Sequence, residues 1–175
     1  MSTPARIVFY GVAGAGKTTL AARVAERLQI PLTSADSLFW RPGWVKVDVA
    51  EQRRLMGEVF AQDRWVVDSA WSSVRTETLE RADLLVCLDY PWWLTGSRLL
   101  RRTVRRVVTK EHVCNGNVES LRTMLWGSEA ILVWWLRTVR SRHRSIARLA
   151  HLPHPDVVVL RRPADAEEWL ATLGG

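Results

Sequence analysis

The sequence predicts an α/β fold of three layers, in which a five-stranded parallel sheet lies between helices on both faces. Short apolar segments rich in β-branched residues alternate with segments of helical periodicity along the 175 residues. The first apolar segment runs directly into a glycine-rich stretch, residues 11–18, that opens a helix. Strands that alternate with helices in this way pair in parallel and are covered on both faces.

The first half of the chain supplies three of the expected strands. Residues 5–10 are apolar and end at a glycine, which is typical of a buried parallel strand. Leu20, Val24 and Leu28 repeat at helical spacing and predict a helix over 17–29. The further elements expected here are a short strand or its exit loop at 30–36, a helix at 48–62 with Asp48 as its N-cap, and a strand at 64–68.

The second half supplies two more strands and the longest helices. Residues 82–89 are the most apolar strand segment and are expected near the middle of the sheet. The other elements expected are a short helix at 76–81, a helix at 91–108, an Asn-Gly loop at 109–117, helical segments from 118 and over 128–150, a strand at 156–160 and a helix at 164–173. No repeat or linker interrupts the pattern, so residues 1–175 are expected to form one domain.

Composition narrows the class of protein. Nearly half of the residues are hydrophobic, which favours a globular fold over disorder. Cys87 and Cys114 are the only cysteines, so a disulfide framework or a zinc site is not expected and a reducing cytoplasm fits. The N-terminal residues lack a signal-peptide pattern, and no apolar run approaches the ~20 residues that span a bilayer. We therefore expect a cytoplasmic protein that does not bind membranes.

Residues 11–18 match the pattern G-x-x-x-x-G-K-T between a strand and a helix. Glycines let successive backbone N–H groups point at an anion, and the helix N-terminus adds partial positive charge. We expect ATP to bind here, with Lys17 at the β- and γ-phosphates, Thr18 at Mg²⁺ and Thr19 at the α-phosphate. The nucleotide-binding residues expected are Gly11, Val12, Ala13, Gly14, Ala15, Gly16, Lys17, Thr18 and Thr19.

Three aspartates follow expected strands and should meet at the carboxyl edge of the sheet. Asp68 is the preferred second group, with Thr18, for organising Mg²⁺, and Asp89 is the alternative. Asp36 is placed to accept the proton of an acceptor hydroxyl, or only to cap the next turn. Trp40 and Trp44 lie nearby and suit either an acceptor with a ring or plain packing.

Positive charge is concentrated in the second half of the chain. Residues 96–148 hold eleven arginines and one lysine against three glutamates, whereas the whole chain has a net charge of +7. Arginines recur at helical spacing, which predicts an Arg-rich lid over about 98–145. Arg102, Arg106 and Arg137 are its candidates for contacting a transferred phosphoryl group. The same arginines could instead bind nucleic-acid backbone or form a solvated surface. The sequence contains no recognised nucleic-acid-binding motif.

Five segments occur together in an order that resembles a known family. These are "GVAGAGKTTLA", "DSLFWRPGW", "RWVVDSAWSSVR", "RADLLVCLDYP" and "NGNVESL". They resemble the adenylate-kinase-like P-loop family often labelled topology modulation proteins, over about residues 7–173. The resemblance implies a P-loop NTPase fold of nucleoside-monophosphate-kinase type with strand order 2-3-1-4-5. It also implies ATP and Mg²⁺ at the glycine-rich loop and an acceptor site between Asp36, Trp40 and Asp68.

The resemblance also implies a role for Arg75, which matches the family pattern and is a candidate for binding an acceptor phosphate or stabilising the transition state. Other positions depart from that pattern. Asp68-Ser69-Ala70-Trp71 stands where the family usually reads Asp-Gly-Asn-Tyr, and Trp92 and Val118 stand where it usually has Arg. Two cations and one amide near the expected acceptor and lid are therefore replaced.

These observations favour a phosphotransferase that moves the γ-phosphoryl group of ATP to a nucleotide or another small acceptor, bound by Asp36, Trp40, Trp44 and Arg75. The alternative is a slow ATPase that binds nucleic acid or an acidic partner through its basic lid. A third possibility is a kinase-like protein without turnover. A GTPase switch is not expected, because the sequence lacks an Asn-Lys-x-Asp segment. A monomer and a homodimer both stay open.

Overall fold

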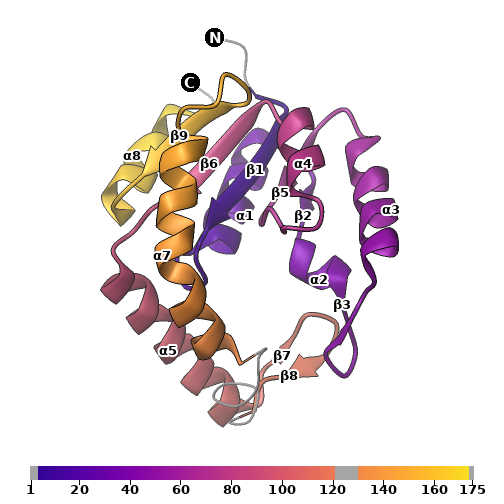
Figure 1. Ribbon diagram of the computed structural model, residues 1–175, viewed down its shortest axis with the longest axis vertical. Helices are drawn as coiled ribbons and strands as arrows, with labels where there is room; N and C mark the ends of the chain where they lie inside the picture. The colour runs from indigo at the N-terminus through magenta and orange to yellow at the C-terminus, as the bar shows by residue number, and fades with distance from the viewer. Residues whose placement is uncertain (1–3, 121–129, 174–175) are drawn as a thin grey trace.

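A computed structural model describes residues 4–120 and 130–173 and contains a central parallel sheet (Figure 1). Its strands are β1 (Arg6–Gly11), β2 (Leu32–Thr33), β5 (Trp65–Val67), β6 (Leu84–Leu88) and β9 (Asp156–Leu160). They lie in the order β2-β5-β1-β6-β9. Numbered within this sheet alone, the order is 2-3-1-4-5, so both the α/β class and the expected topology are confirmed.

Helices cover both faces of this sheet. The long helices are α1 (Lys17–Leu28), α3 (Val49–Phe60), α5 (Trp92–Thr109), α7 (Ile131–Leu149) and α8 (Pro163–Thr172), and the short ones are α2 (Ala35–Phe39) and α4 (Arg75–Arg81). Among the described helices, none combines the length and apolarity needed to cross a membrane.

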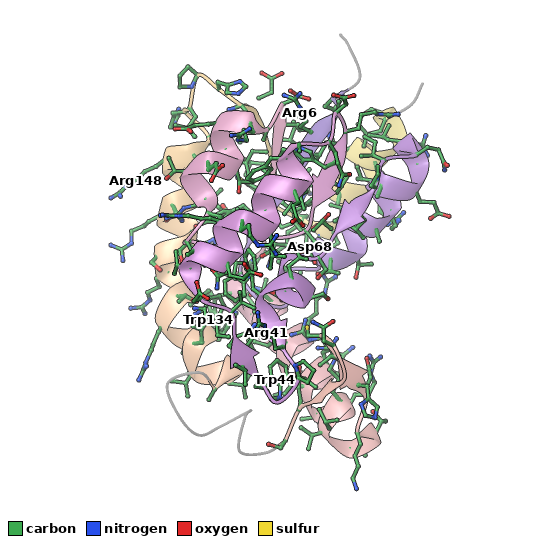
Figure 2. All side chains as sticks on the ribbon, turned by 90° about the vertical axis from the view of Figure 1, so that its right-hand side faces the viewer. Arg6, Arg41, Trp44, Asp68, Trp134 and Arg148 are labelled. Atoms are coloured by element: carbon green, nitrogen blue, oxygen red, sulfur yellow. The ribbon has the colours of Figure 1, made fainter. Side chains whose placement is uncertain are left out.

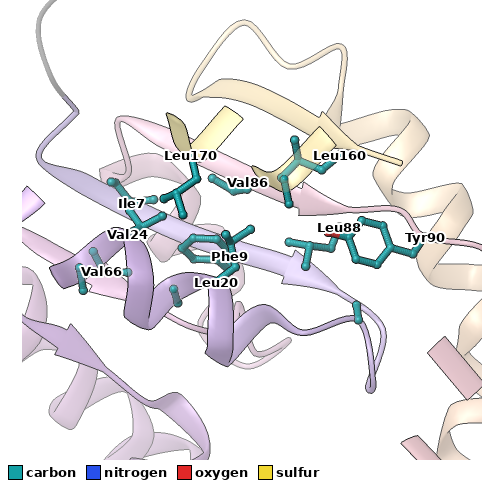
Figure 3. Packing of buried hydrophobic residues seen from close by; sticks show 14 of the residues in the cluster. Ile7, Phe9, Leu20, Val24, Val66, Val86, Leu88, Tyr90, Leu160 and Leu170 are labelled. Atoms are coloured by element: carbon teal, nitrogen blue, oxygen red, sulfur yellow. The ribbon is translucent and has the colours of Figure 1, made fainter. Parts of the chain in front are cut away.

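Successive side chains of β1 point to opposite faces of the sheet, and the core accordingly consists of two clusters. Ile7 and Phe9 point to the face covered by α1 and α8, where Leu20, Val24 and Leu170 pack against them (Figure 3). Val8 and Tyr10 point to the opposite face, where the cluster includes residues of α3, α4 and the C-terminal half of α7. β1 lies between β5 and β6, and both faces of the sheet are covered, so Ile7, Val8, Phe9 and Tyr10 are at most 2% exposed.

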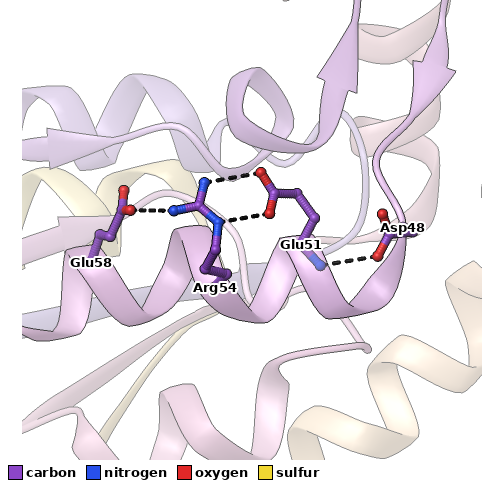
Figure 4. Close-up of polar contacts among 4 residues, drawn as sticks. All are labelled: Asp48, Glu51, Arg54 and Glu58. Carbon is purple, nitrogen blue, oxygen red and sulfur yellow. Dashed lines mark hydrogen bonds and ion pairs between the residues drawn. The ribbon is translucent and has the colours of Figure 1, made fainter.

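Helix α3 begins where the sequence predicts. The Asp48 side chain caps the helix by accepting a hydrogen bond from the Glu51 N–H at 3.0 Å. The guanidinium of Arg54 bridges the carboxylates of Glu51 and Glu58 on the outer face of this helix (Figure 4). The Arg54 guanidinium lowers the pKa of Glu51, chiefly through its hydrogen bond with that carboxylate.

Two short hairpins and helix α2 were not predicted. Strands β3 (Trp40–Arg41) and β4 (Val45–Lys46) form one hairpin, and β7 (His112–Val113) and β8 (Asn117–Val118) form the other. The second hairpin replaces the loop expected at 109–117. Val118 itself lies in β8, where a helix was expected to begin, and residues 121–129 of that expected helix fall outside the described residues.

The glycine-rich loop packs tightly against α5. Gly14 has a φ of +81°, and a Cβ at this position would lie 2.2 Å from the carbonyl oxygen of Thr95. Both the left-handed backbone and the close approach therefore require glycine here.

We expect Gly14→Ala to lower the free energy of unfolding by ~1–3 kcal/mol, because the new methyl group must displace backbone of α5. Gly57→Ala is the matched control, since Gly57 lies in α3 and a Cβ there meets nothing within 4 Å. The control should be stabilised by roughly 0.5–1 kcal/mol. Urea unfolding of both variants measures the difference, and equal stabilities would contradict the packing described.

Candidate nucleotide and acceptor site

A cavity of about 340 Å³ opens at the carboxyl edge of the sheet. Its walls come from the glycine-rich loop, from α2 and β4, from the segment after β5, and from α5 and α7. Parallel strands end at one common edge, so segments far apart in the sequence meet there. Figure 2 shows Asp68 in the interior, with Trp44 on the hairpin side and Arg148 pointing outward from α7.

The glycine-rich loop presents the N-terminus of α1 to this cavity. Gly16 is the N-cap with a φ of 95°, has no side chain that could cap the helix, and is followed by no acidic residue in the first turn. The first N–H groups of α1 therefore have no side-chain acceptor and suit an anion. The Lys17 ammonium lies in the loop and donates a hydrogen bond to the Val12 carbonyl at 3.0 Å.

Burial lowers the pKa of Lys17 to about 8, although the nearby carboxylates of Asp36 and Asp68 act in the opposite direction. A lysine whose charge is poorly solvated in this way gains most from a bound anion. This electrostatic state matches the role expected from the sequence.

Asp68 lies beneath the loop and is only 2% exposed. Its Oδ2 accepts a hydrogen bond from the Thr18 hydroxyl at 2.9 Å, and its Oδ1 accepts one from the Ala35 N–H at 3.0 Å. Burial raises the pKa of Asp68 above its usual range. Two oxygen-bearing side chains in contact, beside an anion site, fit Mg²⁺, which typically binds one or two protein oxygens together with phosphates.

The other carboxylate considered for the metal has a different environment. Asp89 contacts Nδ1 of His143 on α7 and does not line the cavity. The geometry thus favours Asp68 over Asp89 as the group near Thr18.

Asp36 lines the cavity opposite the loop, on the first turn of α2. The indole N–H of Trp71 donates to its Oδ1 at 2.8 Å. Trp71 also makes edge contacts with Phe39 and Trp40, at ring separations of 5.1 and 6.1 Å. The carboxylate is therefore held by a ring that is itself fixed by neighbouring rings.

The rings of Phe39, Trp40 and Trp71 form an aromatic wall, and the two hairpins are joined to each other by hydrogen bonds next to it. The Asn117 side chain accepts a hydrogen bond from the Trp44 N–H at 2.8 Å and donates to the Arg41 carbonyl at 3.0 Å. Asn115 donates to the carbonyls of Ser37 and Trp40. The segments "LFWRPGW" and "NGN" are therefore in direct contact. The Trp44 indole N–H donates to the Val118 carbonyl, so Trp44 supports the wall and does not line the cavity.

Besides Lys17, three cationic side chains line the cavity: Lys46 of β4, Arg102 of α5 and Arg142 of α7. None of the three forms an ion pair within the described part of the chain. Aromatic rings support two of them instead. The Lys46 ammonium lies 5.1 Å from the Trp71 ring centroid, and the Arg142 guanidinium lies 4.9 Å from that of Tyr10.

Burial and the positive charge of Arg106 lower the pKa of Arg102, although it remains charged at neutral pH. Its buried Nε finds no acceptor among the described residues. The cavity therefore carries positive charge that the described residues do not neutralise, which suits a phosphorylated or carboxylated ligand.

The structure brings most of the expected site residues to one place. Those that line the cavity are Gly11, Ala13, Gly14, Gly16, Lys17, Thr18, Thr19, Asp36, Trp40 and Arg102. Arg75 reaches the cavity indirectly, because it donates to the hydroxyl of Tyr10 at 3.1 Å.

Two of the expected lid arginines lie elsewhere. Arg106 forms an ion pair with Glu119 at 3.0 Å, and Arg137 is exposed on α7. Sequence reasoning missed Tyr10, Lys46, Trp71 and Arg142. The Trp71 position was noted only as a departure from the family pattern, and Arg142 lies outside the three- and four-residue spacing of the other α7 arginines.

The buried Lys17 should make stability depend on pH. Its pKa is lower in the folded state, about 8, than the ordinary 10.5, so between these values the unfolded chain binds more protons. The contribution of Lys17 to stability without ligand should therefore rise from pH 8 to 10.5, by up to about 3 kcal/mol. Burial raises the pKa of Cys87 to about 12 and also raises the pKa of Tyr90, so these two groups act in the opposite direction at the upper end of this range. The contribution of Lys17 is therefore measured by denaturant unfolding as the difference in unfolding free energy between the unsubstituted protein and Lys17→Met. This difference should change with pH by that amount, whereas the difference for Lys110→Met should stay constant, and the same pH dependence in both variants would refute the prediction.

No family model and no curated protein sequence matches the chain. Solved structures do match. A gluconokinase from Sinorhizobium meliloti 1021 is 19% identical, with a TM-score of 0.56 over 99% of this chain and 95% of that one. A shikimate kinase from Acinetobacter baumannii in complex with shikimate is 18% identical, with a TM-score of 0.56 over 95% of this chain and 90% of that one.

A deoxyadenosine kinase from M. mycoides with bound dATP is 11% identical, with a TM-score of 0.56 over 98% of this chain and 100% of that one. The alignments span nearly the full length of each protein. The chain therefore has the fold of small P-loop kinases of the adenylate-kinase-like type.

Proposed function

We propose that the protein transfers the γ-phosphoryl group of ATP to a small acceptor that carries an anionic group. One observation carries the proposal: the glycine-rich loop, the Asp36 carboxylate and three cations without ion pairs among the described residues line the same cavity. A hydrolase needs only a water beside the phosphates. Additional cations and aromatic rings beyond the loop provide surface for a second molecule.

The nucleotide half of the site consists of the loop and the start of α1. Backbone N–H groups of the loop surround the phosphates, and Lys17 neutralises charge at the β- and γ-phosphates. Thr18 and Asp68 would hold Mg²⁺, which offsets phosphate charge during transfer. The two side chains are already in contact, because the Thr18 hydroxyl donates a hydrogen bond to the Asp68 carboxylate.

The acceptor half lies between α2, the aromatic wall and α7. Asp36 accepts the proton of the acceptor hydroxyl as its oxygen bonds to the γ-phosphorus, and the bond from that phosphorus to the bridging oxygen of ADP breaks. The Trp71 N–H keeps the carboxylate facing the cavity. After the transfer the proton is on the Asp36 carboxylate, and ADP leaves with the bridging oxygen.

Lys46, Arg102 and Arg142 would hold the anionic group of the acceptor and stabilise the transferred phosphoryl group. Arg75 would act through Tyr10, whose ring lies beneath the Arg142 guanidinium. Arg102 and Arg142 lie on α5 and α7, so a lid over about 98–145 would contribute through these two residues. The proteins of the same fold described above are named as kinases, which supports phosphoryl transfer over binding alone.

A second candidate function rests on the outer face of α7. Arg137, Arg140, Arg144 and Arg148 are exposed there, as a nucleic-acid-binding surface would require. A nucleotide-dependent binder of nucleic acid would show an affinity for DNA or RNA that falls steeply with salt. A kinase would release ADP without either polymer.

The proposed reaction predicts ADP release only when a suitable acceptor is present. A coupled ADP assay should be run with nucleoside monophosphates, nucleosides and hydroxy acids that carry a carboxylate. We expect turnover with an anionic compound, a loss of at least about 100-fold in Lys17→Met and in Asp36→Asn, and normal turnover in Arg161→Met. Acceptor-independent turnover, or full activity in Asp36→Asn, would contradict transfer as described.

The cationic acceptor half predicts a selective effect of Arg142. Removing one charged hydrogen-bond donor should cost about 1.5–3 kcal/mol of acceptor binding, so the KM for the acceptor should rise by roughly 10- to 100-fold in Arg142→Met. The KM for ATP should stay within about threefold. Arg148→Met, an exposed position on the same helix, is the control. A rise in the KM for ATP alone would place Arg142 in the nucleotide half.

A further inference from the structure

A second concave surface lies between α5 and α7 and shares no lining residue with the cavity at the carboxyl edge of the sheet. This groove has a volume of about 360 Å³ and is lined mainly by Trp92, Trp93 and Leu100 of α5 and by Leu132 and Leu136 of α7. Trp92, Trp93 and Leu136 are 64%, 61% and 65% exposed. Side chains this large and apolar are seldom so exposed together on a monomer.

The apolar surface continues along α5 beyond the groove. Val104 and Val108 follow Leu100 at intervals of four residues and are also exposed. Six of the ten large hydrophobic side chains that are exposed among the described residues belong to this stripe and its groove: Trp92, Trp93, Leu100, Val104, Val108 and Leu136. An apolar groove is the kind of surface that binds the apolar face of an amphipathic helix.

A contact between α5 and α7 at the base of the groove keeps the two helices apart. A Cβ at Gly96 would lie 2.8 Å from Cη2 of Trp135, so α5 and α7 already touch at this point. The helices cannot move closer here to bury the exposed side chains. The groove is therefore preformed, which reduces the entropy lost on binding.

The two helices that form the groove are rich in arginine. Helices α5 and α7 together hold ten arginines and no acidic residue. Arg101 lies four positions after Ser97, which lines the groove on α5, and Arg140 lies four positions after Leu136 on α7, so each shares a helix face with a groove residue. Arg137 follows Leu136 directly. These three arginines are exposed, and they form no ion pair with any described residue.

We propose that this groove binds an acidic amphipathic helix of a partner protein. Apolar side chains at i, i+3, i+4 and i+7 of that helix fill the groove, and Asp or Glu residues on its flanks pair with the arginines of α5 and α7. A second copy of this chain would bring the same positive charges to the same surface. A lipid bilayer is flat, whereas the apolar side chains here line a concave surface. Charge and shape therefore favour an acidic helix.

A designed helical peptide tests the proposal directly. The probe is a fluorescent peptide of about 18 residues with Leu at the four spacings and Glu on both flanks, and its control has the same composition shuffled so that the apolar face is lost. Fluorescence anisotropy should show binding of the ordered peptide at micromolar concentration and at least tenfold weaker binding of the shuffled one.

Variants then locate the binding surface. Leu100→Ser with Leu136→Ser, and separately Arg101→Glu with Arg140→Glu, should each weaken binding at least tenfold. Arg161→Glu, at an exposed position after β9, should bind normally. All of these positions are exposed, so circular dichroism and thermal melting should show intact folds.

Three results would overturn the proposal. Equal binding of both peptides, or binding unaffected by the groove variants, would exclude a specific helix site. Sedimentation with phosphatidylcholine–phosphatidylglycerol vesicles that the groove variants abolish, without peptide binding, would assign the surface to anionic lipid. Dimerisation in analytical ultracentrifugation that Leu136→Ser abolishes would assign it to a second copy. None of these assays depends on kinase activity.

Discussion

The candidate site depends on two hydrogen bonds that the buried carboxylate of Asp68 accepts. A carboxylate removed from water must be satisfied by hydrogen bonds, and this one binds the Thr18 hydroxyl and the Ala35 N–H. It thereby connects the end of β5 to the starts of α1 and α2. Asp36 follows Ala35 directly, and Trp71 lies three residues after Asp68, so this one side chain also fixes the geometry of the acceptor half.

Aromatic rings orient two cations of the cavity, Lys46 and Arg142, whereas carboxylates in their place would neutralise the charge. Tyr10 and Trp134 contact the Arg142 guanidinium, and Trp71 contacts the Lys46 ammonium. A ring face positions a cation without removing its charge. In a partly buried cavity such charges act on a ligand more strongly than they would in water. The abundance of tryptophan and arginine in this chain is in part explained by this arrangement.

Local patterns were sufficient to predict the strands of the sheet, the long helices and the place of the glycine-rich loop between β1 and α1. Apolar periodicity and the glycine spacing are properties of neighbouring residues, so they can be read from one sequence. The hairpins β3–β4 and β7–β8 could not be predicted in this way. Each strand has two residues, and the two hairpins are joined by hydrogen bonds of Asn115 and Asn117 to residues more than seventy positions away.

The same limit applies to the arginines. Helical spacing shows that Arg102, Arg106 and Arg137 are periodic, but it does not show which face of the helix meets the cavity. Arg102 lines it, Arg106 is paired with Glu119, and Arg137 is exposed. Arg142 lines the cavity and was missed because it lies outside the three- and four-residue spacing of the other α7 arginines. One of the rings that it contacts, Tyr10, lies far away in the sequence on β1.

The contact between the two hairpins makes the acceptor wall a composite of two distant segments. Asn117 is 3% exposed and lies outside the cavity, yet it fixes the backbone of Arg41 and Trp44. Grafting the Trp40–Lys46 segment alone onto another protein of this fold would leave its backbone groups without these partners. An engineer who wishes to transplant this wall of the cavity would have to move both segments together.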